Sequence, residues 1–125
     1  MWIYTTVGFF SVVQKKGQAD DLLMVRGRFR GDLEALREAY LPELGAVTEY
    51  GGTDYAFRAP VTKVAFTRAM ARIVADMTYD NFKNEVSRQQ GPERARIYHD
   101  VWDVMFREQN RAERNARNRK DVPVE

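Results

Sequence analysis

The sequence predicts a single α+β domain, in which a mostly antiparallel sheet of about five strands carries helices on one face. Segments rich in aromatic and β-branched residues come early and return before residue 62, and the later part repeats apolar residues at helical spacing. The resulting order is β-β-β-α-β-β-α-α-α, with strands and helices grouped, which favours a two-layer sandwich. The middle part, β-α-β-β-α, resembles a ferredoxin-like plait whose remaining strand would come from the N-terminus.

Three N-terminal segments are predicted to be extended. Residues 2–6 and 8–14 form two short strands or one bent strand around Gly8, and residues 22–30 form the next strand. Alternation in that strand predicts one face with Leu23, Val25, Gly27 and Phe29 and an opposite face with Met24, Arg26, Arg28 and Arg30.

The first helix is expected to start at Asp32, whose carboxylate is suited to an N-cap. Its apolar face would hold Leu33, Leu36 and Tyr40, and Pro42 and Gly45 would end it. Two further strands, residues 46–50 and 55–61, flank a Gly-Gly-Thr-Asp turn in which glycine supplies the positive φ.

Three more helices complete the prediction. Thr62 is expected to cap the first of them, whose apolar residues are Phe66, Met70, Ile73, Val74 and Met77. Asp80 is expected to cap a short helix over residues 81–90, which Gly91 and Pro92 interrupt. The last helix carries the clearest apolar stripe: Tyr98, Val101, Trp102, Met105 and Phe106.

The composition is that of an ordinary globular domain. Hydrophobic residues make up 44% and charged residues 30% of 125 residues, which is enough for one core. The absence of cysteine excludes disulfides and thiolate metal ligands and is typical of a cytoplasmic protein. The apolar start lacks the pattern of a signal peptide, and no run approaches the roughly 20 apolar residues of a membrane span, so no membrane partner is expected.

The small positive net charge of +2 arises entirely within residues 107–125, because residues 1–106 are neutral overall. We therefore expect an α+β domain over 1–106 and a basic helical extension or tail over 107–125, partly disordered. The tail residues that could attract phosphates without sequence preference are Arg111, Arg114, Arg117, Arg119 and Lys120. The alternative is a solvated tail with no partner.

The stripe of Arg26, Arg28 and Arg30 has two interpretations. One face of a two-layer sandwich is often in water, and arginines there need no partner. The other interpretation is a platform for anions, because the planar guanidinium matches phosphate and carboxylate. A neighbouring acid such as Glu49 could neutralise it.

A possible pocket is suggested by two segments that combine aromatic with polar residues at the ends of predicted elements. The residues concerned are Asp54, Tyr55, Arg58, Tyr79, Asn81 and Lys83. They could converge on a small anionic or planar ligand, or they could be helix caps and core aromatics with polar tips.

Other motifs carry little chemistry. His99 lies near Asp100 and Asp103, but no serine, cysteine or second histidine accompanies it, so catalysis is not expected there. No residue spacing suggests a metal site, and we expect no cofactor. Residues 7–13 match the RNP1 pattern of RNA-recognition motifs poorly, because Phe9 and Phe10 are adjacent and would point to opposite faces.

Several stretches together resemble a family of short bacterial proteins of unknown function: MWIYTTVGFFSVVQ, DLEALREAYLPELG, TDYAFRA, YDNFK and YHDVW. The resemblance runs to about Phe106 and carries no activity, cofactor or catalytic residues with it. It implies that these segments belong to one fold and that the arginine-rich tail lies outside the shared part.

We therefore expect a non-enzymatic binding or accessory protein whose partner is anionic, either nucleic acid or the acidic surface of another protein. One alternative is a small enzyme or ligand-binding protein that uses a pocket near Tyr55, Arg58, Asn81 and Lys83. Another is a protein–protein inhibitor or assembly subunit, including a homo-oligomer, that pairs through an edge strand or the Trp102 stripe.

Overall fold

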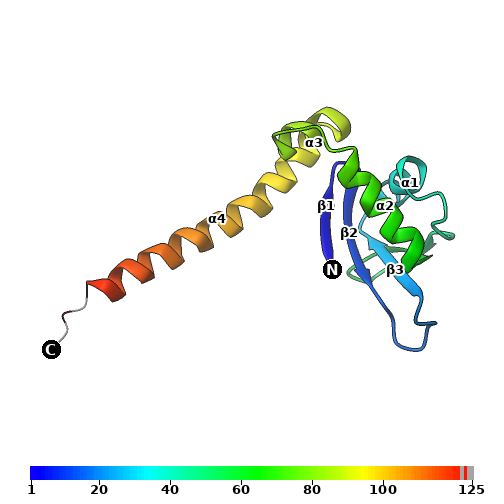
Figure 1. The fold of residues 1–125 in the computed structure, drawn as a ribbon, viewed down its shortest axis with the longest axis horizontal. Coiled ribbons are helices and arrows are strands. Elements are labelled where there is room, and N and C mark those ends of the chain that lie inside the picture. Colours follow the sequence, from blue (N-terminus) through cyan, green and yellow to red (C-terminus); the bar gives the residue numbers. More distant parts are fainter. Residues whose placement is uncertain (122, 124–125) are drawn as a thin grey trace. The chain divides into compact units, whose positions relative to one another are not determined.

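The structure, a computed structural model, describes residues 1–121 and 123. The chain divides into two compact units, Met1–Asp80 and Asn81–Glu125. We call them the N-terminal unit and the C-terminal unit and describe each by itself. The N-terminal unit holds the sheet and two helices, and the C-terminal unit holds two helices (Figure 1).

The sheet has five strands in the order β1-β2-β3-β5-β4, and every neighbouring pair is antiparallel. The strands are β1 (Trp2–Thr5), β2 (Gly8–Val13), β3 (Leu22–Gly27), β4 (Thr48–Glu49) and β5 (Phe57–Thr62). Helix α1 (Arg30–Ala39) connects β3 to β4, and α2 (Lys63–Ala75) follows β5. This arrangement confirms the predicted α+β class.

The sheet also has the expected plait connectivity. Because β5 lies antiparallel between β3 and β4, those two strands run parallel, and α1 makes the crossover between them. The place on the other side of β3 is filled by β2, which arrives from the N-terminal hairpin. The remaining strand therefore does come from the N-terminus, and β1 extends the sheet beyond it.

The core lies between one sheet face and the two helices α1 and α2. Sheet residues such as Phe10 and Val25 share a buried cluster with Leu33 and Leu36 of α1 and Phe66 of α2. Phe10 is completely buried, whereas its neighbour Phe9 is half-buried, as alternation along a strand requires. Burial of such side chains contributes about 1.5–3 kcal/mol each to folding.

The transition from β3 to α1 differs from the prediction. The strand ends at Gly27 and the helix begins at Arg30, so Arg28 and Arg30 are not strand residues. Phe29, expected on the core face, is the N-cap residue and is 51% exposed. The chain must turn here to lay α1 across the sheet, and this tertiary requirement overrides the extended pattern of the sequence.

Asp32 does not cap α1 but lies in its first turn, buried. Its Oδ2 accepts a hydrogen bond from the backbone N–H of Phe9, 3.2 Å away, and so ties α1 to the β1–β2 hairpin. A Cβ atom at Gly8 would lie 2.7 Å from both Cβ and Cγ of Asp32, so only glycine permits this approach. The Asp32 carboxylate thus accepts a hydrogen bond from strand β2 while it lies in the first turn of α1, where negative charge is favoured.

The second and third helices confirm one cap and correct another. Thr62 Oγ1 accepts from the N–H of Ala65, as predicted. Helix α3 (Phe82–Gln90) is capped by Asn81, whose Oδ1 accepts from the N–H of Asn84 at 2.9 Å, and not by Asp80. The helix starts one residue later than predicted, which makes Asn81 the flanking residue.

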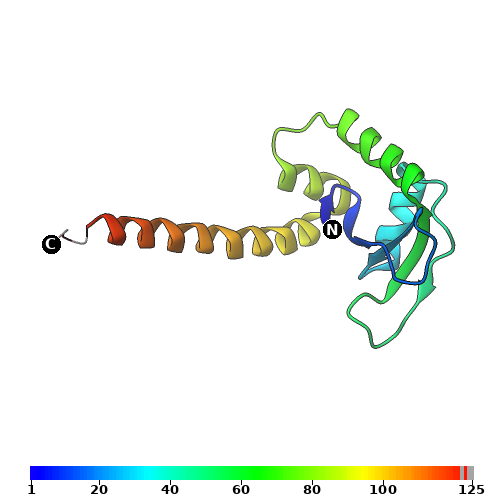
Figure 2. The ribbon, with the colours of Figure 1, turned by 60° about the horizontal axis from the view of Figure 1, so that its bottom comes forward.

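Helix α4 (Pro92–Lys120) follows a turn at Gly91, which has φ +98°, and Pro92 begins it as predicted. Figure 2 shows α3 folded back beside the start of α4, which then continues as one long helix. Its 29 residues correspond to about 43 Å. The domain boundary expected after Phe106 lies inside this helix.

Two predicted apolar stripes are only partly buried. On α2, Phe66 is buried, Val74 is exposed, and Met77 lies beyond the end of the helix and is also exposed. On α4, Tyr98 is buried, but Trp102 and the apolar residues near it are exposed. An apolar periodicity therefore located these helices correctly but overstated how much of each is covered.

Candidate anion-binding site

Arg26 and Arg58 lie directly opposite each other on the sheet face that α1 and α2 leave uncovered. Arg26 of β3 pairs in register with Arg58 of β5, and Ser11 of β2 lies on the other side of Arg26. Residues opposite each other in antiparallel strands project from the same face. Two positive side chains in this position repel each other, which disfavours the pair unless something compensates.

Tyr55 provides part of that compensation. Its ring is only 3% exposed, and the guanidinium carbons of Arg26 and Arg28 lie 4.7 and 4.5 Å from the ring centre. Such contacts of a cation with an aromatic face are attractive. Nη2 of Arg26 also donates to Ser11 Oγ at 2.6 Å, and Nη1 of Arg28 donates to the carbonyl of Asp54 at 2.6 Å.

Arg58 is held from the same loop between β4 and β5. Its Nε donates to the carbonyl of Tyr55 at 3.4 Å, and its guanidinium carbon lies 5.0 Å from the ring centre of Tyr50. The loop itself is ordered by a backbone hydrogen bond from Tyr50 N to Ala56 O at 2.6 Å and by Gly52 at φ +79°. The glycine therefore supplies the predicted positive φ. We call Arg26, Arg28 and Arg58 the arginine cluster.

Arg30, the third residue of the predicted stripe, lies apart from this cluster. As the first residue of α1, it pairs with Glu34 at 3.9 Å and lies over the ring of Phe57. The stripe predicted from alternation is therefore wrong at Arg30 and incomplete without Arg58, which a different strand contributes.

The positive charge of the arginine cluster is not neutralised by the part of the chain that the structure describes. Within that part, no carboxylate forms an ion pair with Arg26, Arg28 or Arg58. Glu49, the acid considered from sequence, pairs in register with Phe57 and so projects from the opposite face.

Most N–H donors of the arginine cluster are not used in the hydrogen bonds described above. A guanidinium carries five N–H donors, and each of these arginines uses one in the contacts above. Nε of Arg26 is buried and has no hydrogen-bond partner among the described residues. A buried donor without a partner costs free energy, which an anion placed against it would recover.

Aromatic residues occupy the other half of the same sheet face. Trp2 of β1 pairs with Ser11, and Tyr4 pairs with Phe9. The Tyr4 and Phe9 rings stack with their centres 4.5 Å apart, and Trp2 meets Phe9 edge-on at 5.9 Å. Trp2, Tyr4 and Tyr50 were not considered from sequence as binding residues, and Phe9 was considered only within the poor match to the RNP1 pattern. The two-residue spacing of Trp2 and Tyr4 in a predicted strand could have indicated that both rings project from one sheet face.

The residues of the predicted pocket fall into both units. Asp54, Tyr55 and Arg58 belong to the N-terminal unit and are brought together by the contacts described above. Tyr79 is half-buried near the end of that unit. In the C-terminal unit, Asn81 is the α3 cap and Lys83 contacts α4, so both have structural roles.

Lys83 takes part in a stacked row of side chains on α4. Its Nζ lies 3.0 Å from His99 Nδ1, and it lies 4.7 Å from the ring centre of Trp102. His99 stacks on Trp102, and Trp102 stacks on Phe106. Since an ammonium group only donates, this geometry makes Nδ1 of His99 the acceptor. His99 therefore has a packing partner and a hydrogen-bond partner but no nucleophile in this row.

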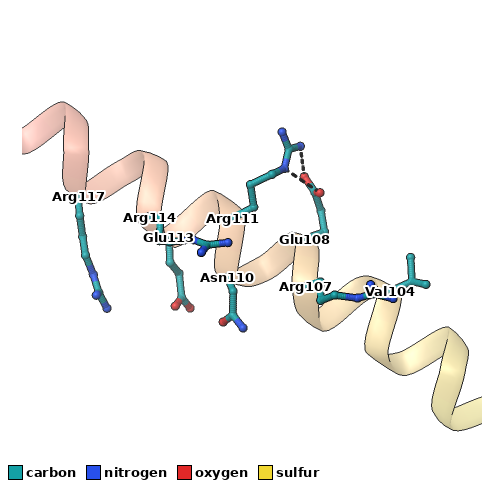
Figure 3. Close-up of a pocket in the computed structure, with 8 residues that line it drawn as sticks. All are labelled: Val104, Arg107, Glu108, Asn110, Arg111, Glu113, Arg114 and Arg117. Carbon is teal, nitrogen blue, oxygen red and sulfur yellow. Dashed lines mark hydrogen bonds and ion pairs between the residues drawn. The ribbon is translucent and has the colours of Figure 1, made fainter.

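The predicted basic tail is helical as far as Lys120. Figure 3 shows a hollow on α4 that is bounded by side chains of this one helix, so it is no cleft between elements. There, Arg111 donates from Nε to Glu108 at 3.0 Å, and this ion pair lowers the pKa of the Glu108 carboxyl. Arg107 pairs with Asp103 at 3.1 Å. Within the described residues, four cations of the segment have no such partner: Arg114, Arg117, Arg119 and Lys120.

Comparisons with known proteins add no assignment: no protein-family model matches the chain, and no curated protein or solved structure matches it. The resemblance to a bacterial family therefore stays a prediction. Among the described residues, no helix is long and apolar enough to cross a membrane, and no group of three or more histidine, aspartate or glutamate side chains could hold a metal ion.

Proposed function

We propose that this chain is a non-enzymatic binding protein that holds an anionic partner at the arginine cluster. The observation that carries the proposal is the Arg26–Arg58 pair, two cations directly opposite each other with no carboxylate in ion-pair contact among the described residues. A fold retains such repulsion only where other contacts or a ligand offset it. Planar guanidinium groups that are already held in place suit phosphate or carboxylate groups.

The lack of cysteine supports a cytoplasmic location for this activity. Nucleic acid and the acidic surface of another protein both present the required anions. The unpaired cations at the end of α4 would strengthen either interaction over a longer distance without specifying it.

Binding to a polyanion across a series of salt concentrations tests the proposal. Arg58→Gln and Arg28→Gln each remove one charge from the cluster. Arg68→Gln is the matched control, because Arg68 is an exposed residue of α2 and the cluster lies on the other sheet face. A second control replaces the four unpaired cations of α4 by glutamine in the full chain.

We expect each cluster variant to weaken binding and to reduce the salt slope by about one unit, as for the loss of one phosphate contact. The Arg68 control should bind like the unchanged protein. Equal binding by all cluster variants would refute the proposal. Binding lost only with the α4 replacements would place the interaction on the helix and not on the sheet.

A second candidate function is assembly through α4. Its exposed apolar residues are Ile97, Val101, Trp102, Val104, Met105 and Phe106. Apolar side chains gathered on one exposed helix are typical of a protein contact. Sedimentation over a range of concentrations tests it: Met105→Glu should shift an oligomer to monomer, and a protein that is monomeric at every concentration would rule out self-assembly.

A further inference from the structure

The sheet face opposite α1 and α2 combines two kinds of chemistry in one cross-strand row. Trp2, Ser11, Arg26 and Arg58 follow each other across β1, β2, β3 and β5. An indole and a guanidinium therefore stand at the two ends of this row, on the same face, about 14 Å apart at the usual strand spacing. Both belong to the N-terminal unit.

The aromatic end of the row is exposed at Trp2. The Trp2 side chain is 66% exposed, and Tyr4, two residues along the same strand face, is 36% exposed. Phe9 is half-buried beneath them and contacts both rings, so it supports their positions. An exposed indole whose position is supported by a neighbouring ring is a surface on which another flat apolar group can stack.

From this juxtaposition we infer that the anionic partner is a single strand of nucleic acid, with a base stacked on Trp2 and backbone phosphates at the arginine cluster. The inference rests on the proposed function and specifies its ligand. Single-strand binding combines these two elements, a positively charged groove for the backbone and aromatic side chains for the bases.

A duplex fits this face less well, because its bases are stacked on each other and do not offer their flat surfaces. An acidic protein surface would use the arginines but would offer no flat group to stack on the exposed indole of Trp2. Tyr50, 46% exposed beneath the guanidinium of Arg58, extends the same combination of ring and cation to the β5 side of the sheet.

The test measures binding of the full chain to fluorescently labelled short oligonucleotides at low and moderate salt. The probes are a single-stranded RNA, a single-stranded DNA, a DNA of the same length with abasic positions, and a duplex. The variants are Trp2→Ala, Tyr4→Ala and Arg58→Gln. Trp102→Ala is the matched control, because it removes the other tryptophan from the C-terminal unit.

Stacking of one base on one aromatic residue predicts that Trp2→Ala weakens single-strand binding roughly 5-fold to 100-fold. The abasic probe should bind more weakly than the normal strand and should not respond to Trp2→Ala. A second measurement needs no change at the site. In Trp102→Phe, Trp2 is the only tryptophan, and the normal strand should quench its fluorescence whereas the abasic strand should not.

The outcomes distinguish failure of the single-strand inference from failure of the anion-binding site. If Arg58→Gln weakens binding but Trp2→Ala, Tyr4→Ala and the abasic probe change nothing, the anion site stands and the single-strand inference is refuted. Duplex binding as tight as single-strand binding refutes it as well. If no probe binds at low salt, the inference fails, and binding of an acidic polypeptide would then show whether the anion site survives. Absence of quenching of Trp2 by a bound normal strand also overturns the stacking.

Discussion

Replacing Asp32 by alanine should destabilise the N-terminal unit, because this side chain joins α1 to the hairpin that presents Trp2 and Tyr4. Asp32 is buried, and its Oδ2 accepts the N–H of Phe9. Alanine leaves that N–H without its partner, at a cost of about 1–3 kcal/mol. Loss of a negative charge in the first turn of a helix adds about 0.3–1 kcal/mol.

Together these effects predict a decrease of about 2–3 kcal/mol in the free energy of unfolding. For a chain of this size each kcal/mol lowers the melting temperature by roughly 4 °C, so we expect a decrease of about 10 °C. Asp32→Asn keeps an oxygen acceptor and loses only the charge, so it should cost about 1 kcal/mol or less.

The assay is urea unfolding followed by the fluorescence of Trp2 in a Trp102→Phe background, which reports on the N-terminal unit alone. Glu38→Ala is the matched control, because Glu38 is an exposed acid on the same helix. The reasoning is refuted if Asp32→Ala is no more destabilising than Glu38→Ala, or if Asp32→Asn costs as much as Asp32→Ala.

Three further predictions concern the core, a helix cap and a titration. Phe10→Ala should lower the free energy of unfolding by about 3–5 kcal/mol, measured in the same assay, because Phe10 is completely buried and leaves a cavity. Asn81→Ala should lower the free energy of unfolding of the C-terminal unit by about 1 kcal/mol, measured by thermal unfolding, because Asn81 makes the cap hydrogen bond. Asp80→Ala should leave this free energy unchanged within the experimental error. The hydrogen bond from Arg88 lowers the pKa of Glu85 to about 2, below its ordinary 4.5, so the pair stabilises the folded state above about pH 4.5 and loses this effect as the pH falls towards 2. A carboxyl NMR titration should show this midpoint, and Arg88→Ala should return it towards 4.5; an unchanged midpoint would contradict the assigned cause.

The candidate site was predictable only in part. Alternation along residues 22–30 correctly placed Arg26 on the face opposite Val25. It failed at Arg30, because local periodicity cannot show where a strand turns into a helix. Arg58 was noted for a different site, and its position opposite Arg26 depends on the pairing of two strands separated by a helix and a further strand.

Two of the three predicted helix caps, Thr62 and Asp32, also show what local sequence can and cannot determine. Thr62 was identified correctly because its hydroxyl acts within three residues, a distance that local sequence governs. Asp32 has the residue type of a cap, but its carboxylate serves Phe9, 23 positions earlier in the chain. Local sequence patterns cannot predict a hydrogen bond between residues so far apart in the chain.

By itself the sequence determined the α+β class and the order of the elements, because these follow from the short-range periodicity of apolar side chains. Only the tertiary structure decided which side chains meet on the sheet face opposite α1 and α2. Strand register brings Trp2, Arg26 and Arg58 into one row, and the loop between β4 and β5 places Tyr55 against two guanidinium groups. These contacts join distant parts of the chain, and their geometry depends on the packing of the whole unit.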